Sequence, residues 1–211
     1  EKHDFLKSCL KLLDTVGMTE DMAAARAVRL IQDGKLVSYG DSVFKAKTFR
    51  IEESLAYEIV RKMHGTVAEY PNLDQAIDHE ERKLGFRLAP EQREAVKMGL
   101  TSKLCVITGG PGTGKTSVQK ALLDLYKERY PAAKIACCAP TGKAARRMEQ
   151  STGVPSSTVH RALGLIANED GHYGDPETLD ADLVLVDEVS MLDVYLAEKL
   201  FRSVPATARL I

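Results

Sequence analysis

The sequence contains no tryptophan, and aromatic residues make up only 6% of its 211 residues. It has no apolar run of the roughly 18 residues that a membrane-spanning helix needs, so no membrane partner is expected. The 29 Lys and Arg nearly balance the 30 Asp and Glu, and the formal net charge of −1 gives no global basic field that would indicate nucleic acid. The hydrophobic (44%) and charged (28%) fractions predict a soluble globular protein of one or two domains.

Cysteine is also scarce, and the four cysteines show no paired metal-ligand spacing. Adjacent Cys137 and Cys138 would point to opposite faces of a strand, and Cys9 and Cys105 also lie among apolar residues. We interpret all four as reduced core residues, which favours a cytoplasmic protein. The chain begins at Glu1 without a signal peptide and ends on an apolar pair, so both ends are expected to be cut from a longer protein.

The near-zero net charge hides an uneven distribution along the chain. Residues 134–166 carry five basic residues and one acid, for a net charge of +4. Residues 167–188 carry eight acids and no Lys or Arg. The first of these segments is therefore the one place where local charge favours a polyanionic partner.

Residues 1–86 are predicted to form a small, mainly helical, winged-helix-like accessory domain. Apolar spacing predicts helices over 5–16, 20–33, 51–64 and 73–84, and strands over 36–39 and 42–44 flank a Gly40-Asp41 turn. A winged-helix unit could read a DNA groove, but 13 basic and 15 acidic side chains over residues 1–84 do not favour it. A role in packing or in partner contact remains the alternative, and we place the boundary at Gly85.

Residues 87–211 alternate between strand and helix. Short apolar segments predict strands over 104–108, 135–139 and 183–186, and the intervening segments predict helices over 114–130, 142–150 and 193–203. Strands that alternate with helices form a parallel sheet with helices on its faces, so we predict an α/β fold. The irregular residues 167–178 are expected to form a small hairpin.

A phosphate-binding loop is the strongest motif in the sequence. Residues 109–116 fit the pattern G-x-x-x-x-G-K-[ST] between a predicted strand and a predicted helix. Glycines let backbone N–H groups surround a phosphate, Lys115 would reach the β- and γ-phosphates, and Thr116 would hold Mg²⁺. The predicted nucleotide-binding residues are Gly110, Pro111, Gly112, Thr113, Gly114, Lys115, Thr116 and Ser117.

A second half of the same site is predicted at Asp187 and Glu188. They directly follow the apolar strand over 183–186, at the sheet edge where α/β proteins bind ligands. Asp187 would hold Mg²⁺ through water, and Glu188 would orient and deprotonate the attacking water. We therefore expect Lys115, Asp187 and Glu188 to be catalytic, with ATP and Mg²⁺ as cofactors.

Gln92 is the candidate that would select the base. It lies in the first turn of a helix that Pro90 is predicted to begin. A glutamine amide can pair with N6 and N7 of adenine, which favours ATP over GTP. The alternative is an ordinary solvated helix residue.

Five segments together resemble the RecD-like DNA helicases, the B branch of the first helicase superfamily, which includes the exodeoxyribonuclease V alpha chains and the stand-alone bacterial RecD-like helicases. The segments are residues 90–92, 109–116, 139–145, 157–164 and 186–193. The resemblance is strong over 87–211 and looser over 1–86. It implies an ATP-driven motor with two RecA-like lobes that moves 5′ to 3′ along single-stranded DNA, of which this chain would supply the accessory region and the first lobe.

The resemblance also implies a DNA contact over residues 139–145, where Pro140, Thr141, Lys143 and Arg146 would grip the backbone. A hydroxyl and N–H groups after a strand can bind a phosphate, and the basic side chains add charge. A solvated helix face is the alternative. In the segment 157–164, His160 would contact DNA or serve as a structural residue.

The chain departs from the family pattern in what is missing. The Gly-Asp-x-x-Gln-Leu-Pro segment and the arginines of a second lobe are absent, so this chain would supply one wall of the ATP site. An AAA+ ATPase would lack the Pro-Thr-Gly-Lys run at 140–143, and a GTPase would need an Asn-Lys-x-Asp motif. A non-catalytic nucleotide-binding interaction module remains the alternative from a different class. Whether nuclease subunits accompany the protein is left open.

Overall fold

The computed structural model describes residues 19–165 and 174–211. The helix predicted over 5–16 and Cys9 lie outside these residues. The chain divides into two compact units, Glu1–Ser54 and Leu55–Ile211, and each is described by itself. No helix of the described residues is long and apolar enough to cross a membrane.

The first unit confirms the predicted second helix and hairpin. Helix α2 (Glu20–Gln32) begins after Thr19, whose hydroxyl oxygen accepts a hydrogen bond from the Met22 N–H at 3.4 Å, as an N-cap does. Strands β1 (Leu36–Tyr39) and β2 (Ser42–Lys45) pair in an antiparallel register around Gly40, which has a φ of 55°. Helix α3 (Ala46–Met63) follows at once. It begins five residues before the predicted start, directly after the last residue of β2.

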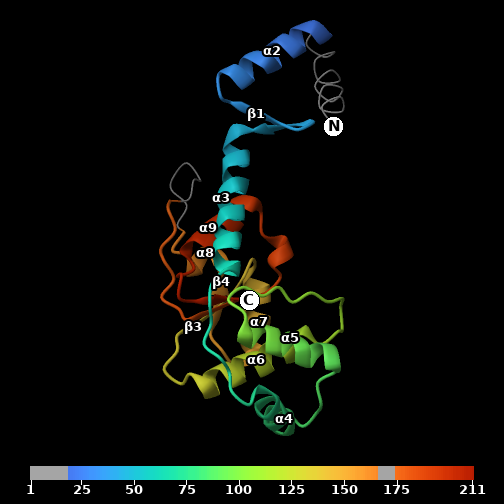
Figure 1. Cartoon of the computed structure of the whole chain (residues 1–211), viewed down its shortest axis with the longest axis vertical. Coiled ribbons are helices and arrows are strands. Elements are labelled where there is room, and N and C mark those ends of the chain that lie inside the picture. Colours follow the sequence, from blue (N-terminus) through green and yellow to red (C-terminus); the bar gives the residue numbers. More distant parts are fainter. Residues whose placement is uncertain (1–18, 166–173) are drawn as a thin grey trace. The chain divides into compact units, whose positions relative to one another are not determined.

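The second unit is a parallel sheet with helices on both faces, as predicted. Its four strands lie in the order β4-β3-β5-β6, and every neighbouring pair is parallel. Figure 1 labels β3 and β4 of this sheet together with the helices of the unit. Its elements after α3 are α4 (Leu73–Leu84), α5 (Pro90–Thr101), α6 (Lys115–Arg129), β3 (Ile135–Ala139), α7 (Gly142–Thr152), β4 (Ser156–Thr158), α8 (Val159–Ala162), β5 (Leu183–Val186), the 3-10 helix η1 (Val189–Met191), α9 (Val194–Ser203) and β6 (Arg209–Leu210).

Two apolar cores lie on opposite faces of this sheet. Cys137 and Leu185 belong to the core that contains side chains of α5 and α6, whereas Cys138 and Val184 belong to the core that contains side chains of α9. Adjacent cysteines therefore do point to opposite faces of β3, as predicted. Burial raises the pKa of both thiols to about 12, so they stay protonated and unreactive.

The strand predicted over 104–108 is wrong in extent. Only Leu104 forms a bridge with Leu210, and the Cys105 N–H donates to the Leu210 carbonyl at 3.0 Å. Its neighbour in the sheet is β6. Val106 is 66% exposed despite its apolar side chain.

The remaining boundaries differ little from prediction. Helix α6 begins and ends one residue inside the predicted range, and α7 continues two residues beyond it to Thr152. Of the hairpin expected over 167–178, residues 174–178 form no strand, and the rest lies outside the described residues. Helix α4 ends at Gly85 and packs on α6 within the second unit. The functional boundary at Gly85 stays a prediction.

Candidate functional site

The phosphate loop leads from Gly109 into the first turn of α6. Gly112 and Gly114 have φ values of 75° and 81°, which glycine adopts without steric cost. The Lys115 ammonium donates to the carbonyls of Gly109 at 2.5 Å and Gly110 at 3.1 Å, and the Thr113 hydroxyl also donates to Gly110. The positive charge therefore lies over the loop, beside the N–H groups at the start of α6 that have no partner within the helix.

Gln92 joins α5 to this loop. Its Nε2 donates to the Thr113 carbonyl at 2.9 Å, and its Oε1 accepts from the Ala89 N–H at 2.9 Å. A Cβ placed on Gly114 would lie 2.3 Å from Gln92 Nε2, so this glycine is needed for close approach as well as for its φ. The Oε1 and Nε2 atoms of Gln92 each keep one further hydrogen-bonding position, which a contact with adenine would use. That contact stays a prediction.

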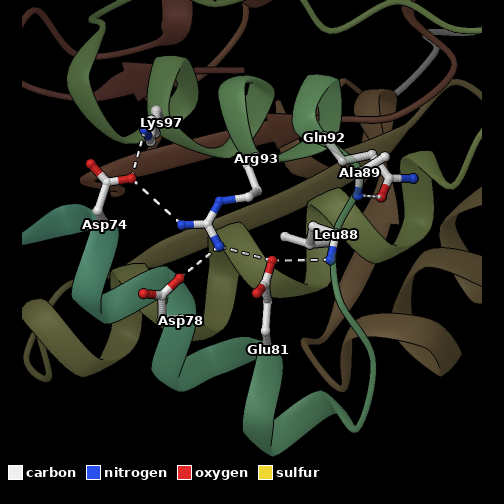
Figure 2. A network of polar contacts seen from close by, with 8 residues as sticks. All are labelled: Asp74, Asp78, Glu81, Leu88, Ala89, Gln92, Arg93 and Lys97. Carbon is white, nitrogen blue, oxygen red and sulfur yellow. Dashed lines mark hydrogen bonds and ion pairs between the residues drawn. The ribbon is translucent and has the colours of Figure 1, made fainter.

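A polar network from α4 holds the start of α5 in place (Figure 2). Glu81 is 8% exposed, and its Oε1 accepts hydrogen bonds from the Leu88 N–H and pairs with Arg93, both at 3.0 Å. Arg93 also binds Asp78 at 2.8 Å, while Asp74 binds Lys97 at 2.6 Å. The sequence analysis missed this network. In the sequence, the network is indicated only by three acids on one face of α4 (Asp74, Asp78 and Glu81) and by two cations four residues apart on α5 (Arg93 and Lys97).

Asp187 and Glu188 leave the carboxyl end of β5, as predicted. Asp187 Oδ1 accepts a hydrogen bond from Gln119 Nε2 at 3.0 Å, which ties it to the helix that begins with Lys115. Gln119 was also missed, although it lies one helical turn after Lys115. Glu188 has a φ of 54°, a left-handed conformation that is uncommon for a residue with a Cβ and is concentrated at functional sites.

A cavity of about 310 Å³ collects the three predicted catalytic residues. Lys115, Asp187 and Glu188 all line it, together with Gln119 and apolar side chains of β5 and α9. The structure therefore brings together side chains more than 70 residues apart in the sequence. Lysine, a carboxylate that can face a metal, and an exposed second carboxylate are the groups that phosphoryl transfer to water requires.

The donors at this edge fit Mg²⁺. Thr116 is exposed in the first turn of α6, and Asp187 supplies a carboxylate after β5. Mg²⁺ prefers oxygen ligands and is commonly held by one or two protein groups, substrate phosphates and water. Within residues 19–165 and 174–211 no group of three or more His, Cys, Asp or Glu could hold a metal.

The predicted DNA-binding residues lie at the same sheet edge. Thr141 is the N-cap of α7, and its hydroxyl oxygen accepts from the Ala144 N–H at 3.2 Å. Pro140 is half-buried, whereas Lys143 and Arg146 are exposed. The Thr141 hydroxyl hydrogen remains available for a phosphate oxygen, and the first N–H groups of α7 point the same way.

His160 follows β4 in the first turn of α8 and is half-buried. Because Thr158 in β4 pairs with Ala139 in β3, the segments after these two strands leave the sheet at neighbouring positions. Thr158 caps α8 by accepting from the Arg161 N–H at 3.2 Å. Whether His160 contacts DNA stays a prediction.

Comparison with known proteins identifies similar sequences. The AAA domain family matches residues 92–211. The chain is 40% identical over 140 residues to the ATP-dependent RecD2 DNA helicase of Deinococcus radiodurans, which covers 66% of this chain and 19% of that protein. It is 33% identical over 185 residues to the RecBCD enzyme subunit RecD of Haemophilus influenzae, covering 74% and 29%.

One solved structure is also similar, the UvsW helicase from bacteriophage T4. Its TM-score is 0.45 at 13% identity, with 59% of this chain and 51% of that chain covered. The two curated relatives above are much longer than this chain, which spans less than a third of either.

Proposed function

We propose that this chain, which belongs to the AAA domain family as a RecD-like member, is the accessory region and first motor lobe of an ATP-dependent DNA helicase. The observation that carries the proposal is the cavity at the carboxyl edge of the sheet. It is lined by Lys115, Asp187 and Glu188, the three groups that ATP hydrolysis needs.

The residues of this edge have separate roles in hydrolysis. The backbone N–H groups of Gly110 and residues 112–116 and the Lys115 ammonium bind the phosphates of ATP and stabilise the negative charge of the transferring group. Thr116 and Asp187 hold Mg²⁺, which neutralises phosphate charge when bound. Glu188 accepts a proton from water as the water oxygen attacks the γ-phosphorus, so that ADP and phosphate are released.

Single-stranded DNA is the second substrate. Thr141, the N-terminus of α7, Lys143 and Arg146 bind its phosphates, and because they contact no bases the grip is independent of sequence. The 5′ to 3′ direction and a second lobe that completes the ATP site follow from the resemblance to RecD-like motors. A cytoplasmic location stays a prediction.

The test is calorimetric titration of the chain with Mg·ATP. We expect weak binding by the wild type and none by Lys115→Ala, because the phosphate loop is self-contained but lacks an opposite lobe. Lys120→Ala is the matched control, since Lys120 lies on the same helix but pairs with Asp124 at 2.8 Å. Equal affinities of the wild type and Lys115→Ala would contradict the assignment.

Other ATPase classes and a non-catalytic binding module are not favoured. The module would explain a nucleotide-binding loop, but it gives no reason for Glu188 to stand beside Asp187 and Lys115 in one cavity. A flat ATP titration of the wild type would favour the module. Unwinding of DNA by these 211 residues alone would contradict the need for a second lobe.

A further inference from the structure

A second cavity lies at the opposite, amino edge of the sheet. It has a volume of about 600 Å³, within the range of roughly 300–1,000 Å³ that is typical of ligand sites. Asp182 and Arg209, which line it, stand at the starts of β5 and β6, whereas the phosphate loop lies beyond the strands' carboxyl ends. We call this cavity the amino-edge cleft.

Positive side chains dominate the lining of the amino-edge cleft. Lys103, Arg129 and Arg209 line it, against a single acid, Asp182. Arg209 is 5% exposed and donates to the carbonyls of Leu100 and, at 3.4 Å, Ala68. The Lys103 ammonium donates to the Thr207 carbonyl. Over the described parts of the chain, neither Lys103 nor Arg209 has a carboxylate within ion-pair distance.

The charge of these cations is therefore poorly compensated. Burial, with Arg209 adding to it, lowers the pKa of Lys103. Behind it, Lys62 is 4% exposed and donates to the Val204 carbonyl at 2.8 Å. Burial lowers the pKa of Lys62 to about 8, with Arg61 and Lys103 contributing in the same direction. A buried cation without a counter-ion costs free energy, which a bound anion would offset.

Tyr130, independently of the charges, supports a ligand at the cleft through the environment of its ring and hydroxyl. Its ring centroid lies 5.4 Å from the Arg129 guanidinium carbon and 5.7 Å from that of Arg209. Its hydroxyl is buried and has no hydrogen-bond partner within residues 19–165 and 174–211. The neighbouring Tyr126, by contrast, donates to the Asp182 carbonyl at 3.3 Å. Buried polar groups are nearly always paired, so this hydroxyl, on a residue that lines the cleft, is a donor that a bound acceptor would satisfy.

The stem of Lys103 is held in place by close packing. A Cβ placed on Gly65 would lie 2.7 Å from Lys103 Cγ, so only glycine leaves room for the lysine stem at this point. The bond to Thr207 fixes the other end of the side chain, and two ammonium protons remain free to donate. The lysine is thus pre-oriented at the cleft.

We propose that the amino-edge cleft binds a phosphate group, which accepts a hydrogen bond from the Tyr130 hydroxyl and is neutralised by Lys103 and Arg129. A phosphate has several acceptor oxygens and suits donors that converge from different elements. The cavity leaves room for groups esterified to it. The phosphate belongs either to a free nucleotide or to a nucleic-acid strand. The proposal does not depend on ATP hydrolysis, because the two sites lie at opposite ends of the strands.

The experiment uses the full chain carrying Lys115→Ala, so that the phosphate loop no longer contributes. Calorimetric titrations with inorganic phosphate, dTMP and oligo-dT are compared with and without Tyr130→Phe. We expect saturable phosphate binding that Tyr130→Phe weakens about tenfold, the scale of a lost hydrogen bond to a charged group. Lys103→Gln and Arg129→Gln should have effects of similar size. Arg82→Gln, which removes an exposed charge of α4, is the control.

Comparison of the dTMP and oligo-dT titrations shows whether the bound phosphate belongs to a free nucleotide or to a nucleic-acid strand. If Tyr130→Phe weakens oligo-dT about tenfold, the ligand is a strand; if it weakens dTMP but not oligo-dT, the ligand is a free nucleotide. Tyr130→Phe keeps the ring, and an unchanged unfolding midpoint shows that the fold is intact. Absence of saturable binding, or equal affinities with and without Tyr130→Phe for every titrant, would overturn the proposal. Neither result bears on Lys115 or Glu188.

Discussion

The two edges of the parallel sheet differ in the exposure of their polar side chains and in their backbone conformation. At the carboxyl edge, Glu188 is exposed, and the backbone adopts positive φ at Gly112, Gly114 and Glu188 itself. At the amino edge, Arg209 and Tyr126 are buried and bind backbone carbonyls. Local charge alone does not distinguish the edges. Of these three residues with positive φ, only Glu188 carries a Cβ in a left-handed conformation, a strained backbone of the kind that is retained where function requires it.

The largest effect should come from a substitution at Glu188, whose backbone is left-handed. In the full-length protein, Glu188→Gln should leave ATP binding intact and slow hydrolysis at least about 10²-fold, because the amide keeps the shape but cannot accept the proton. Single-turnover hydrolysis and nucleotide binding are measured side by side. Glu94→Gln, an exposed residue on α5, is the control. A near-normal rate for Glu188→Gln would move the general base elsewhere.

Substituting two glycines of the phosphate loop distinguishes the cost of a positive φ from the cost of a steric contact with Gln92. Gly112→Ala should cost about 1–2 kcal/mol of nucleotide-binding free energy through its positive φ alone, because its Cβ meets nothing within 4 Å. Gly114→Ala should cost about 1 kcal/mol more, since its Cβ displaces Gln92 and breaks the bond to Thr113.

Calorimetric dissociation constants for Mg·ATP test this difference. Added to Gln92→Ala, Gly114→Ala should cost no more than Gly112→Ala does, because the bond to Thr113 is already lost. If the two single glycine variants bind equally, Gln92 does not constrain the loop. Gln92→Ala alone should also reduce the preference for ATP over GTP if the amide contacts adenine.

At the amino edge, stability should depend on alkaline pH through Lys62. Its pKa falls from 10.5 to about 8 on folding, so the unfolded chain binds more protons between these values. The contribution of Lys62 to stability should therefore rise as pH increases from about 8 towards 10.5, by at most about 1.4 kcal/mol per pH unit, and it is constant below pH 8. The raised pKa values of the buried Cys137 and Cys138 thiols act in the opposite direction above about pH 9, so the contribution is read from the difference between the wild type and Lys62→Met. Lys62→Met should lack this rise. Urea unfolding of both proteins from pH 7.5 to 10 gives the slopes, and parallel curves would show that Lys62 is not desolvated.

The smallest effect concerns DNA at the carboxyl edge. If Lys143 and Arg146 each bind a DNA phosphate as proposed, Lys143→Ala and Arg146→Ala should each flatten the log–log dependence of single-strand affinity on salt by roughly 0.7. The decrease in affinity should be similar for different base sequences, since a side chain that binds the backbone does not read bases. Filter binding of the full-length variants at several salt concentrations measures the slope. A slope unchanged from the wild type would favour a solvated helix face for α7.

Local features of the fold and site were predictable from the sequence. The hairpin at Gly40, the caps at Thr19 and Thr141 and the helix after the phosphate loop depend on hydrogen bonds between residues two to four apart. Such contacts form wherever the right side chains occur at the right spacing. The apolar strand before Asp187 was equally readable, because a strand buried on both faces needs a continuous apolar run.

Tertiary structure alone decided the contacts that join these pieces. Gln119 meets Asp187 across 68 residues, and Arg209 meets Leu100 across 109. The sequence predicted a strand over 104–108, whereas the structure pairs Leu104 alone, with Leu210 more than 100 residues away. No local pattern encodes these outcomes, since they depend on which elements pack together. The sequence by itself therefore determined the chemistry of the phosphate loop and its carboxylates. Packing decided that they share one cavity and that Tyr130 faces another, because side chains distant in sequence are brought together only when the sheet and its helices assemble.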